Sequence, residues 1–419
     1  MPFRISRRQC LGGLAAILPV AANAQAVPAQ GAAGRDAPRL KRGINIHNAL
    51  NWPQATRARE KTYYSWPAFR AANFQVSDAE LKTLSALGFD FIRLTVDPGI
   101  FIDVAADRFA ALDAHALALV KRFIGAGFSV VFDLHPVALN PDYAPRRLVA
   151  EGSPVFAAYC DLVERLAGVL NELPHDKIAF ELMNEPWIET LPELPRWQPM
   201  LETLHQRARK AAPNLPLVLT GAMWGDLQAM VRLDTKPFRA SNVIYTFHYY
   251  DPHSFTHQGV AGDDAQYLAA VPWPMTARAS TPLVDAASDR IAATAGLTNE
   301  ARTQAIARSR QLVDNLLRKN HGPALLKKDF ALAAAWAKTN GIGTDRLLLG
   351  EFGCVANARD MPLGEDRLRW IEAVRQAAEA EGIAWAYWAY KGYGGMEMAD
   401  RAGKLDTTVL PPLGLRTPA

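Results

Sequence analysis

The chain has 419 residues, and its 46 lysines and arginines against 42 aspartates and glutamates give a formal net charge of +4. Arg4, Arg7 and Arg8 lie in the first 24 residues, which contain no acidic residue, so the rest of the chain carries a formal charge of only +1. A nearly neutral chain argues against nucleic acid or an anionic membrane as a partner. We therefore expect neither.

Residues 1–24 have the features of an export signal peptide. The arginines precede a mildly apolar stretch, and the small residues Ala22-Asn23-Ala24 resemble a cleavage site. The apolar stretch is too short and too rich in Gly and Ala for a permanent membrane anchor. Residues 6–11 resemble the twin-arginine motif, although Cys10 replaces its usual aromatic residue. The sequence thus predicts a periplasmic or secreted protein, exported by the twin-arginine or the general secretory pathway.

Residues 25–38, rich in Ala, Gln, Gly and Pro, predict a flexible leader, and residues 39–419 predict a single domain. Within that domain, apolar runs of strand length alternate with helical patterns, as in the βα units of a parallel sheet. The expected strands are Lys41–Ile46, Phe89–Val96, Phe128–Leu134, Ile178–Met183, Leu215–Thr220, Val243–Phe247, Arg346–Gly350 and Ile383–Trp388.

The first expected helix starts at the N-cap Ser77 and ends before Gly88. The others cover Phe109–Ile124, Val155–Leu173, Met200–Ala211, Phe330–Thr339 and Arg367–Ala380. Eight strands with helices between them predict an α/β fold, a (β/α)₈ TIM barrel. An open doubly wound sheet would be expected to carry a Gly-rich phosphate loop after its first strand, and the sequence has none there.

One connection, after the sixth strand, is much longer than the others. It covers about residues 251–323 and mixes Pro and Trp273 with a helical stretch near residues 303–317. A connection of this length is usually functional, so it predicts an insertion over the mouth of the barrel. The alternative is a stabilising decoration away from the site.

Polar residues follow several of the expected strands. In a TIM barrel the carboxyl ends of the strands form the active face, so these residues should converge on one cleft. Two of them are glutamates, Glu185 after the fourth strand and Glu351 after the seventh. Such a pair suits a glycoside hydrolase, which needs one carboxylic acid to protonate the leaving oxygen and one carboxylate to meet the anomeric carbon. The other polar residues at these strand ends are Arg93, His135, Asn184, His248, Tyr250 and Trp388.

In this order, these residues resemble the Arg, His, Asn-Glu, His-x-Tyr, Glu and Trp of glycoside hydrolase family 5, which contains retaining cellulases. The first-strand segment Lys41-Arg42-Gly43-Ile44-Asn45 is also similar to that of family members. The likeness covers most of the chain. His47 is a departure, because many cellulases of the family have Gly near this position, and the long connection is another.

The resemblance implies that Glu185 is the proton donor and Glu351 the nucleophile. Pro186 and Trp187 flank Glu185 and should help to keep it protonated. Carboxyl groups about 5 Å apart would predict retention of anomeric configuration.

The supporting residues have distinct expected tasks. Arg93 and Tyr250 are expected to orient Glu351, and Asn184 to bond the sugar 2-hydroxyl. His135 and His248 should bracket the cleft. Trp388 would form its floor, and aromatic rings stack well on β-linked sugars. Further rings expected to contact sugar belong to Trp187, Trp52 and Trp273.

The predicted activity is that of an exported retaining endo-β-1,4-glucanase acting on a β-linked polysaccharide or oligosaccharide. Alternatives within the family are β-mannan, xyloglucan, and β-1,3 or mixed-linkage glucan, with exo action if the long connection closes the cleft. A carbohydrate-binding barrel without catalysis is a further alternative. No Cys/His cluster has zinc spacing, so we expect no metal and no cofactor. We also expect a monomer.

Overall fold

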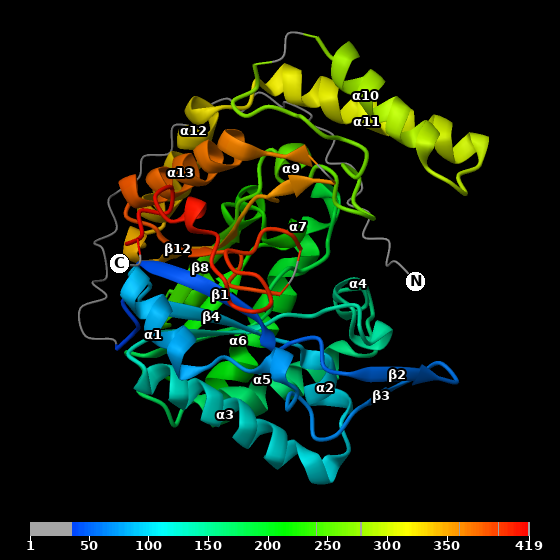
Figure 1. The fold of residues 1–419 in the computed structure, drawn as a ribbon. Helices are drawn as coiled ribbons and strands as arrows, with labels where there is room; N and C mark the ends of the chain where they lie inside the picture. Colours follow the sequence, from blue (N-terminus) through cyan, green and yellow to red (C-terminus); the bar gives the residue numbers. More distant parts are fainter. Residues whose placement is uncertain (1–35, 240, 277–278, 360, 393, 418–419) are drawn as a thin grey trace.

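The computed structural model describes residues 36–239, 241–276, 279–359, 361–392 and 394–417. The expected signal peptide (1–24), and all but the last three residues of the expected leader, lie outside these ranges. At the centre is a closed barrel of eight parallel strands in the order β1-β12-β9-β8-β7-β6-β5-β4 (Figure 1). Its strands are β1 (Arg42–Leu50), β4 (Phe91–Val96), β5 (Ser129–Leu134), β6 (Ile178–Glu181), β7 (Leu217–Thr220), β8 (Val243–His248), β9 (Leu347–Phe352) and β12 (Ala384–Tyr387). The predicted TIM barrel is confirmed.

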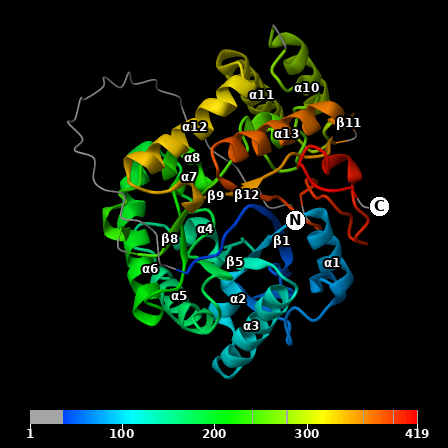
Figure 2. The same cartoon turned by 90° about the vertical axis from the view of Figure 1, so that its left-hand side faces the viewer.

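Six long helices surround the strands (Figure 2). They are α1 (Asp78–Leu87), α3 (Phe109–Gly125), α5 (Phe156–Leu170), α6 (Trp197–Ala211), α12 (Pro323–Thr339) and α13 (Gly364–Ala380). Helix α1 begins with a capping box, in which the Ser77 hydroxyl accepts from the Glu80 N–H and the Glu80 carboxylate accepts from the Ser77 N–H. It ends at Gly88, whose φ of 107° is the left-handed conformation that glycine favours.

Shorter elements complete the structure. The connection between β7 and β8 contains only α7 (Ala222–Gly225), α8 (Leu227–Met230) and a 3₁₀ turn. Outside the barrel, β2 (Ala55–Ala58) and β3 (Lys61–Tyr64) form a hairpin, and β10 (Asn357–Ala358) pairs with β11 (Met361–Pro362). Two further short helices are α2 (Pro98–Asp103) and α4 (Pro145–Leu148).

The inside of the barrel is layered, because alternate residues of a strand point inward. Phe91, Val131 and Ala179 belong to an apolar layer. Gly43 lies beside this layer, where a Cβ would come within 2.2 Å of the Phe91 ring, so only glycine fits. Two residues further along the same strands, the inward positions are Arg93, Asp133 and Glu181. The interior therefore changes from apolar to charged toward the carboxyl ends of the strands.

Strand β1 is longer than expected. It continues to Leu50, and its pairing with β4 shifts register between Ile46 and Leu50. The prediction ended the strand at Ile46 because polar residues follow. The irregular stretch places His47 at the mouth of the barrel, hydrogen-bonded to Thr95 of β4 over 3.0 Å.

The long connection between β8 and α12 contains α9 (His253–Thr256), α10 (Thr281–Ala293) and α11 (Asn299–Lys319). Helices α10 and α11 lie side by side and extend beyond the barrel (Figure 1). The β2–β3 hairpin leaves the same end of the barrel, because β1 and β8 are parallel and both segments follow a strand's carboxyl end. Among the described residues, no helix is long and apolar enough to cross a membrane.

Candidate active site

Arg93 lies inside the barrel with no exposed side-chain surface and binds three carboxylates. Its Nε and Nη2 donate to the two oxygens of Glu181, each over 2.8 Å. Nη2 also lies 3.0 Å from Asp133 Oδ2, and Nη1 donates to Glu351 Oε1 over 2.8 Å. Asn45 accepts from Nη1 over 3.0 Å. The guanidinium is therefore fixed by β1, β5, β6 and β9 at once.

One positive charge faces three carboxyl groups in this cluster. Burial raises the pKa of Asp133 to about 7 against the opposing charge of Arg93. Burial likewise raises the pKa of Glu181 to about 7, again opposed by Arg93. For Arg93 itself burial acts to lower the pKa, but the charges of Asp133 and Glu181 outweigh it and hold the pKa above its usual value. The cluster thus retains protons on carboxyl groups at pH values where exposed carboxyl groups have lost them.

Glu351 stands at the end of β9 with only 5 % of its side chain exposed. Its Oε1 accepts from Arg93, and its Oε2 accepts from the Tyr250 hydroxyl over 2.9 Å. The guanidinium and the hydroxyl together fix the rotamer of the Glu351 side chain.

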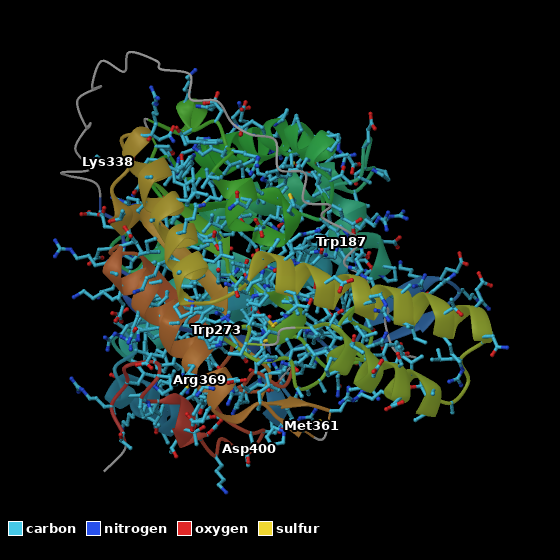
Figure 3. The ribbon with its side chains drawn as sticks, turned by 90° about the horizontal axis from the view of Figure 1, so that it is seen from above. Trp187, Trp273, Lys338, Met361, Arg369 and Asp400 are labelled. Atoms are coloured by element: carbon cyan, nitrogen blue, oxygen red, sulfur yellow. The ribbon has the colours of Figure 1, made fainter. Side chains whose placement is uncertain are left out.

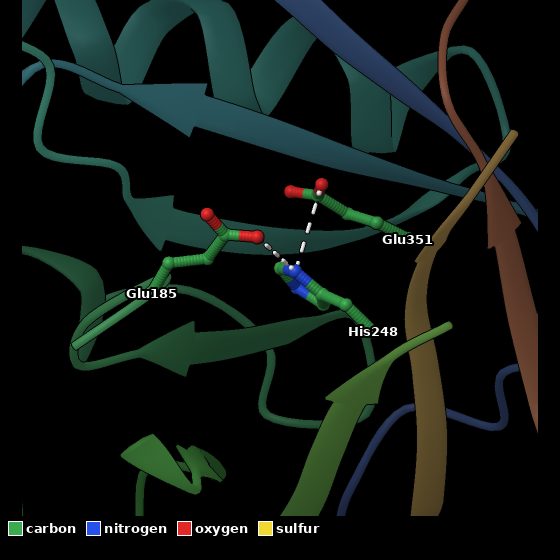
Figure 4. Close-up of side chains that lie close together, drawn as sticks. All are labelled: Glu185, His248 and Glu351. Carbon is green, nitrogen blue, oxygen red and sulfur yellow. Dashed lines mark hydrogen bonds and ion pairs between the residues drawn. The ribbon is translucent and has the colours of Figure 1, made fainter. Parts of the chain in front are cut away.

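Glu185 reaches the same space from the loop after β6 and is more exposed, at 21 % of its side chain (Figure 4). His248 Nδ1 lies 2.9 Å from Glu185 Oε1 and 3.6 Å from Glu351 Oε2, so the ring sits between the two carboxyl groups. One oxygen of each glutamate and a nitrogen of His248 all lie within 4.8 Å of one another. The two carboxyl groups are close enough to act on a single bond.

The two expected histidines are buried and neutral. Burial lowers the pKa of His248 to about 4 and that of His135 to about 4. His135 Nδ1 hydrogen-bonds Asp133 Oδ2 over 2.8 Å, and its Nε2 lies 3.3 Å from Asn184 Nδ2. Asn184 Oδ1 accepts from Arg93 over 2.7 Å. Asn184 is therefore locked in the polar network and presents a fixed edge to the cleft.

Aromatic rings follow strands of the barrel that adjoin those of the two glutamates, since β12 precedes Trp388 and neighbours β9, and β7 precedes Trp224 and neighbours β6. Trp388 stacks on His135, with centroids 5.5 Å apart and planes inclined by 12°, and also contacts His47. Trp52 Nε1 donates to His47 Nε2 over 3.0 Å. Trp187, two residues after Glu185, lies 5.8 Å from Trp224 between ring centroids. These pairs suit stacking against sugar rings.

The expectation that Trp273 contacts sugar is wrong. Its side chain is only 3 % exposed and belongs to the hydrophobic core. Its backbone N–H donates to Asp366, at the start of α13. Figure 3 places Trp273 apart from Trp187. The prediction failed because the sequence of a long connection does not show which of its rings fold back onto the barrel.

Three residues of the network, Asn45, Asp133 and Glu181, were not among the expected site residues. Asn45 donates to the backbone carbonyls of Gly350, Ala386 and Tyr387 and so ties β1 to β9 and β12. Asp133 and Glu181 supply the charges that hold Arg93. A signal was present in the sequence for two of them, because Asp133 comes two positions before His135 and Glu181 four positions before Glu185. Period-two alternation puts all of them inside the barrel.

Among the described residues, the set with spacing suited to a metal ion is Glu185, His248 and Glu351. The chemistry of the set does not favour a metal. Both oxygens of Glu351 are already engaged, one by the guanidinium of Arg93 and the other by the Tyr250 hydroxyl. A permanent cation at 2.8 Å would repel a second one.

A cavity of about 800 Å³ is lined by His248 and Tyr250, which hydrogen-bond the two glutamates, although neither glutamate lines it. His248 and Tyr250 form one end of its lining, Met223 and Trp224 form one wall, and α11 forms another. A second cavity, of about 790 Å³, lies at the amino ends of the strands, next to residues 36–42. None of the clustered carboxylates at the barrel mouth lines this second cavity.

Comparison with known sequences shows that one family model matches most of this chain. The family model described as Cellulase (glycosyl hydrolase family 5) matches residues 56–394. Endoglucanase 3 of Fibrobacter succinogenes is 23 % identical over 366 residues, covering 84 % of this chain and 50 % of the relative. Cellodextrinase A of Ruminococcus flavefaciens is 29 % identical over 196 residues, covering 45 % and 55 %. This chain therefore spans about half the length of these two relatives. Endoglucanase C of Acetivibrio thermocellus is 24 % identical over 326 residues, covering 75 % and 84 %.

Solved structures share the fold at low identity. Cel5A of Thermotoga maritima, in complex with cellobiose, aligns with a TM-score of 0.60 at 20 % identity, covering 90 % of this chain and 97 % of that one. A family 5 xyloglucanase from Paenibacillus pabuli aligns with a TM-score of 0.62 at 17 % identity, covering 90 % and 98 %.

Proposed function

Because the chain belongs to glycosyl hydrolase family 5, we propose that it is a glycoside hydrolase that cleaves β-1,4 bonds of glucan chains with retention of configuration. One observation carries the proposal. A carboxylate oxygen of Glu185 and one of Glu351 lie within 4.8 Å of each other. Retaining enzymes hold their two carboxyl groups about 5–5.5 Å apart, whereas inverting enzymes leave about 6.5–9.5 Å for a water molecule.

The two glutamates take different tasks because their surroundings differ. Glu351 is oriented by hydrogen bonds from Arg93 and Tyr250 and attacks the anomeric carbon as that carbon loses its bond to the leaving oxygen. Glu185, which lies 2.9 Å from His248, gives its proton to that oxygen. In the second step Glu185 takes a proton from water, and the hydroxide oxygen displaces Glu351 from the sugar. Neutral His248, between them, adds no positive charge to hold Glu185 ionised.

Two observations support β-1,4-glucan as the substrate. The aromatic pairs, Trp388 with His47 and Trp187 with Trp224, suit the apolar faces of an extended β-linked chain. Three relatives carry the names endoglucanase or cellodextrinase. Structures of the same fold are described with cellobiose, with mannotriose, or as a xyloglucanase. Mannan, xyloglucan, and β-1,3 or mixed-linkage glucan are therefore the competing substrates.

Two measurements test the proposal. Products released from β-1,4-glucan, β-1,3-glucan, mannan and xyloglucan are compared by size and amount, and we expect mixed cello-oligosaccharides from β-1,4-glucan as the main result. Proton NMR during the first minutes of cello-oligosaccharide hydrolysis should show the β-anomer before mutarotation. A first product with the α-configuration would rule out double displacement, and a clear preference for mannan or xyloglucan would reassign the substrate.

We also propose that the protein acts outside the cytoplasm and as a monomer. The export pattern in residues 1–24 supports the first point. Fractionation of cells that express the full chain, followed by mass determination of the recovered protein, tests both. Recovery from the cytoplasm alone, or a mass of two chains, would contradict the respective proposal.

A further inference from the structure

The cavity lined by His248 and Tyr250 extends from the active site to helix α11. Its lining runs from His248 and Tyr250, past Trp224, to polar residues of α11 that include Gln311, Asn315 and Arg318. These three residues are spaced by four and three positions, so they share one face of the helix. Val313 and Leu316 of the same helix are buried. Leu312 and Leu316 line the cavity as well, so helix α11 presents both apolar and hydrogen-bonding groups to it.

The position of the cavity shows which part of a substrate it meets. Glu185 is the proposed proton donor, so the leaving part of the substrate lies on its side of the cleaved bond. His248, which hydrogen-bonds Glu185, lines the cavity, and Trp224, which contacts Trp187 beside Glu185, forms its wall. Tyr250, which hydrogen-bonds Glu351, also lines the cavity, whereas Trp388 and Trp52 do not.

The backbone beside the cavity is strained where it presents Trp224. Met223 and Trp224 have φ angles of 53° and 58°, in the left-handed region that such residues rarely adopt. Gly225 follows with a φ of 70°, and Asp226 forms a bridge with His248. A Cβ at Gly221 would come within 2.4 Å of the Met230 nitrogen, so this turn has little room to relax. Strain of this kind persists where it fixes a functional side chain.

The charges around the cavity balance. Its lining includes four arginine or lysine residues and four aspartates. Arg308 pairs with Asp264 over 2.6 Å, and Arg318 donates to Asn315 over 2.6 Å. A balanced lining exerts no net attraction on a charged ligand, but it offers many donors and acceptors to hydroxyl groups.

From these contacts we infer that Trp224 and the polar face of α11 form a binding site for neutral glycosyl units on the leaving side of the cleaved bond. The inference rests on the proposed function. The aromatic ring meets one face of a sugar, and Asn315, Arg318 and Gln311 bond its hydroxyl groups. The long connection after β8 then recognises the part of the glucan that departs first.

The test compares two substrates that differ only beyond the cleaved bond. Cellohexaose carries sugars into the proposed site, whereas the aryl group of 4-nitrophenyl β-cellobioside ends before α11. In the variant Asn315→Ala/Arg318→Ala we expect the loss of kcat/KM for cellohexaose to exceed the loss for the aryl cellobioside by about tenfold, the size expected for two lost hydrogen bonds. Trp224→Ala, from the other wall, should show the same bias.

Thr303→Ala/Gln304→Ala is the matched control. Both residues are exposed on the same helix and neither lines the cavity, so the ratio of the two kcat/KM values should stay at that of the parent. Equal losses on both substrates in the α11 variant, or no loss on either, would overturn the inference. Failure of the parent to cleave either substrate would instead refute the proposed function and the inference with it.

A second readout does not depend on leaving-group chemistry. Added cellobiose can replace water in the second step, when its hydroxyl oxygen bonds the anomeric carbon, the ester to Glu351 breaks, and the hydroxyl proton passes to Glu185. This acceptor must occupy the leaving side. The ratio of transfer products to hydrolysis products should therefore fall in Asn315→Ala/Arg318→Ala and in Trp224→Ala, and an unchanged ratio in both would contradict the site.

Discussion

Arg93 donates from Nη1 to Glu351 Oε1 over 2.8 Å from a position where none of the guanidinium is exposed to solvent. A buried charge is stable only when it is paired and hydrogen-bonded. Here the pairing is shared between the proposed nucleophile and two carboxyl groups deeper in the barrel. The charge state of the whole cluster therefore bears on the reactivity of one of its members.

Replacing the proposed nucleophile should remove turnover without unfolding the chain. We expect Glu351→Gln to lower kcat by roughly 10³-fold or more, because no covalent intermediate can form. Glu372→Gln, on the exposed face of α13, serves as the matched control and should keep parental rates. Thermal unfolding measured by circular dichroism checks the fold. A kcat of Glu351→Gln within tenfold of the parent value would refute this role for Glu351. Binding of glycan without turnover by the parent itself would favour a carbohydrate-binding barrel.

Azide distinguishes the two glutamates by product configuration. In Glu351→Ala the small anion can enter the vacated space, bond the anomeric carbon directly and yield an α-glycosyl azide from an activated aryl glycoside. In Glu185→Ala it can capture the sugar bound to Glu351 and yield the β-glycosyl azide. NMR of the products reports the anomer. The reverse assignment of anomers would exchange the proposed roles.

The proton donor should matter most for poor leaving groups. In Glu185→Ala we expect kcat/KM for cello-oligosaccharides to fall by about 10²–10⁴-fold. For 2,4-dinitrophenyl β-cellobioside, whose leaving group needs no proton, kcat/KM should fall far less. Steady-state kinetics on both substrates gives the two losses. Losses of the same size would show that Glu185 does not supply the proton.

The buried carboxyl groups predict a pH dependence of stability with a definite sign. Burial, opposed by Arg93, raises the pKa of Glu181 to about 7 from its ordinary value of 4.5. Between these values the folded chain keeps a proton that the unfolded chain releases, so this group's contribution to the free energy of unfolding falls as the pH rises from about 4.5 to 7. Glutamine cannot titrate. The free energy of unfolding of Glu181→Gln should therefore rise relative to the parent across this window.

Urea unfolding at pH 4.5 and pH 7 measures that difference. Buried His135 and His248, whose pKa values are lowered to about 4, act in the opposite direction in both proteins, so the prediction concerns the difference between variant and parent. Glu372→Gln again provides a control. A difference between Glu181→Gln and the parent that is the same at both pH values would contradict the prediction.

Substitution of Trp388 should affect substrate binding, whereas substitution of Trp273 should affect stability. Trp388→Ala removes a ring at the barrel mouth, and we expect kcat/KM for cellohexaose to fall about tenfold, since a stacking contact contributes about 1 kcal/mol or more. Trp273→Ala leaves a cavity in the core and should lower the free energy of unfolding by about 3–5 kcal/mol with little change in KM. Kinetics and urea unfolding on both variants test the contrast. A larger change in KM for Trp273→Ala than for Trp388→Ala would show that Trp273 contacts the substrate in the cleft.

Chelation tests the metal-compatible set found in the described part of the chain, Glu185, His248 and Glu351. We expect unchanged activity after dialysis against excess EDTA, because the charge of Arg93 already compensates Glu351. Inhibition by added zinc is compatible with this view, since zinc could compete for the two glutamates. Loss of activity in EDTA that zinc or another divalent ion restores would establish a metal-dependent reaction.

The sequence predicted the barrel well because its strands are buried on both sides and read as continuous apolar runs. It also predicted most of the residues at the mouth of the barrel, because the carboxyl ends of the parallel strands converge there. The deeper layer was harder, because Asp133 and Glu181 matter only through Arg93, which comes from another strand. Trp273 and Trp224 show the limit for connections. The first is buried and the second lines the cavity, and no local pattern distinguishes them.

The closure of the barrel joins distant parts of the chain. Residues 42–44 of β1 pair with residues 385–387 of β12, and Asn45 bonds the carbonyls of Gly350 and Ala386 directly beneath the glutamates. Arg93 of β4 and Glu351 of β9 belong to strands far apart in the chain, and the closed barrel brings them together. Recovery of turnover during refolding should therefore follow barrel closure and not the appearance of helices, so turnover itself reports that the two halves of the chain have met.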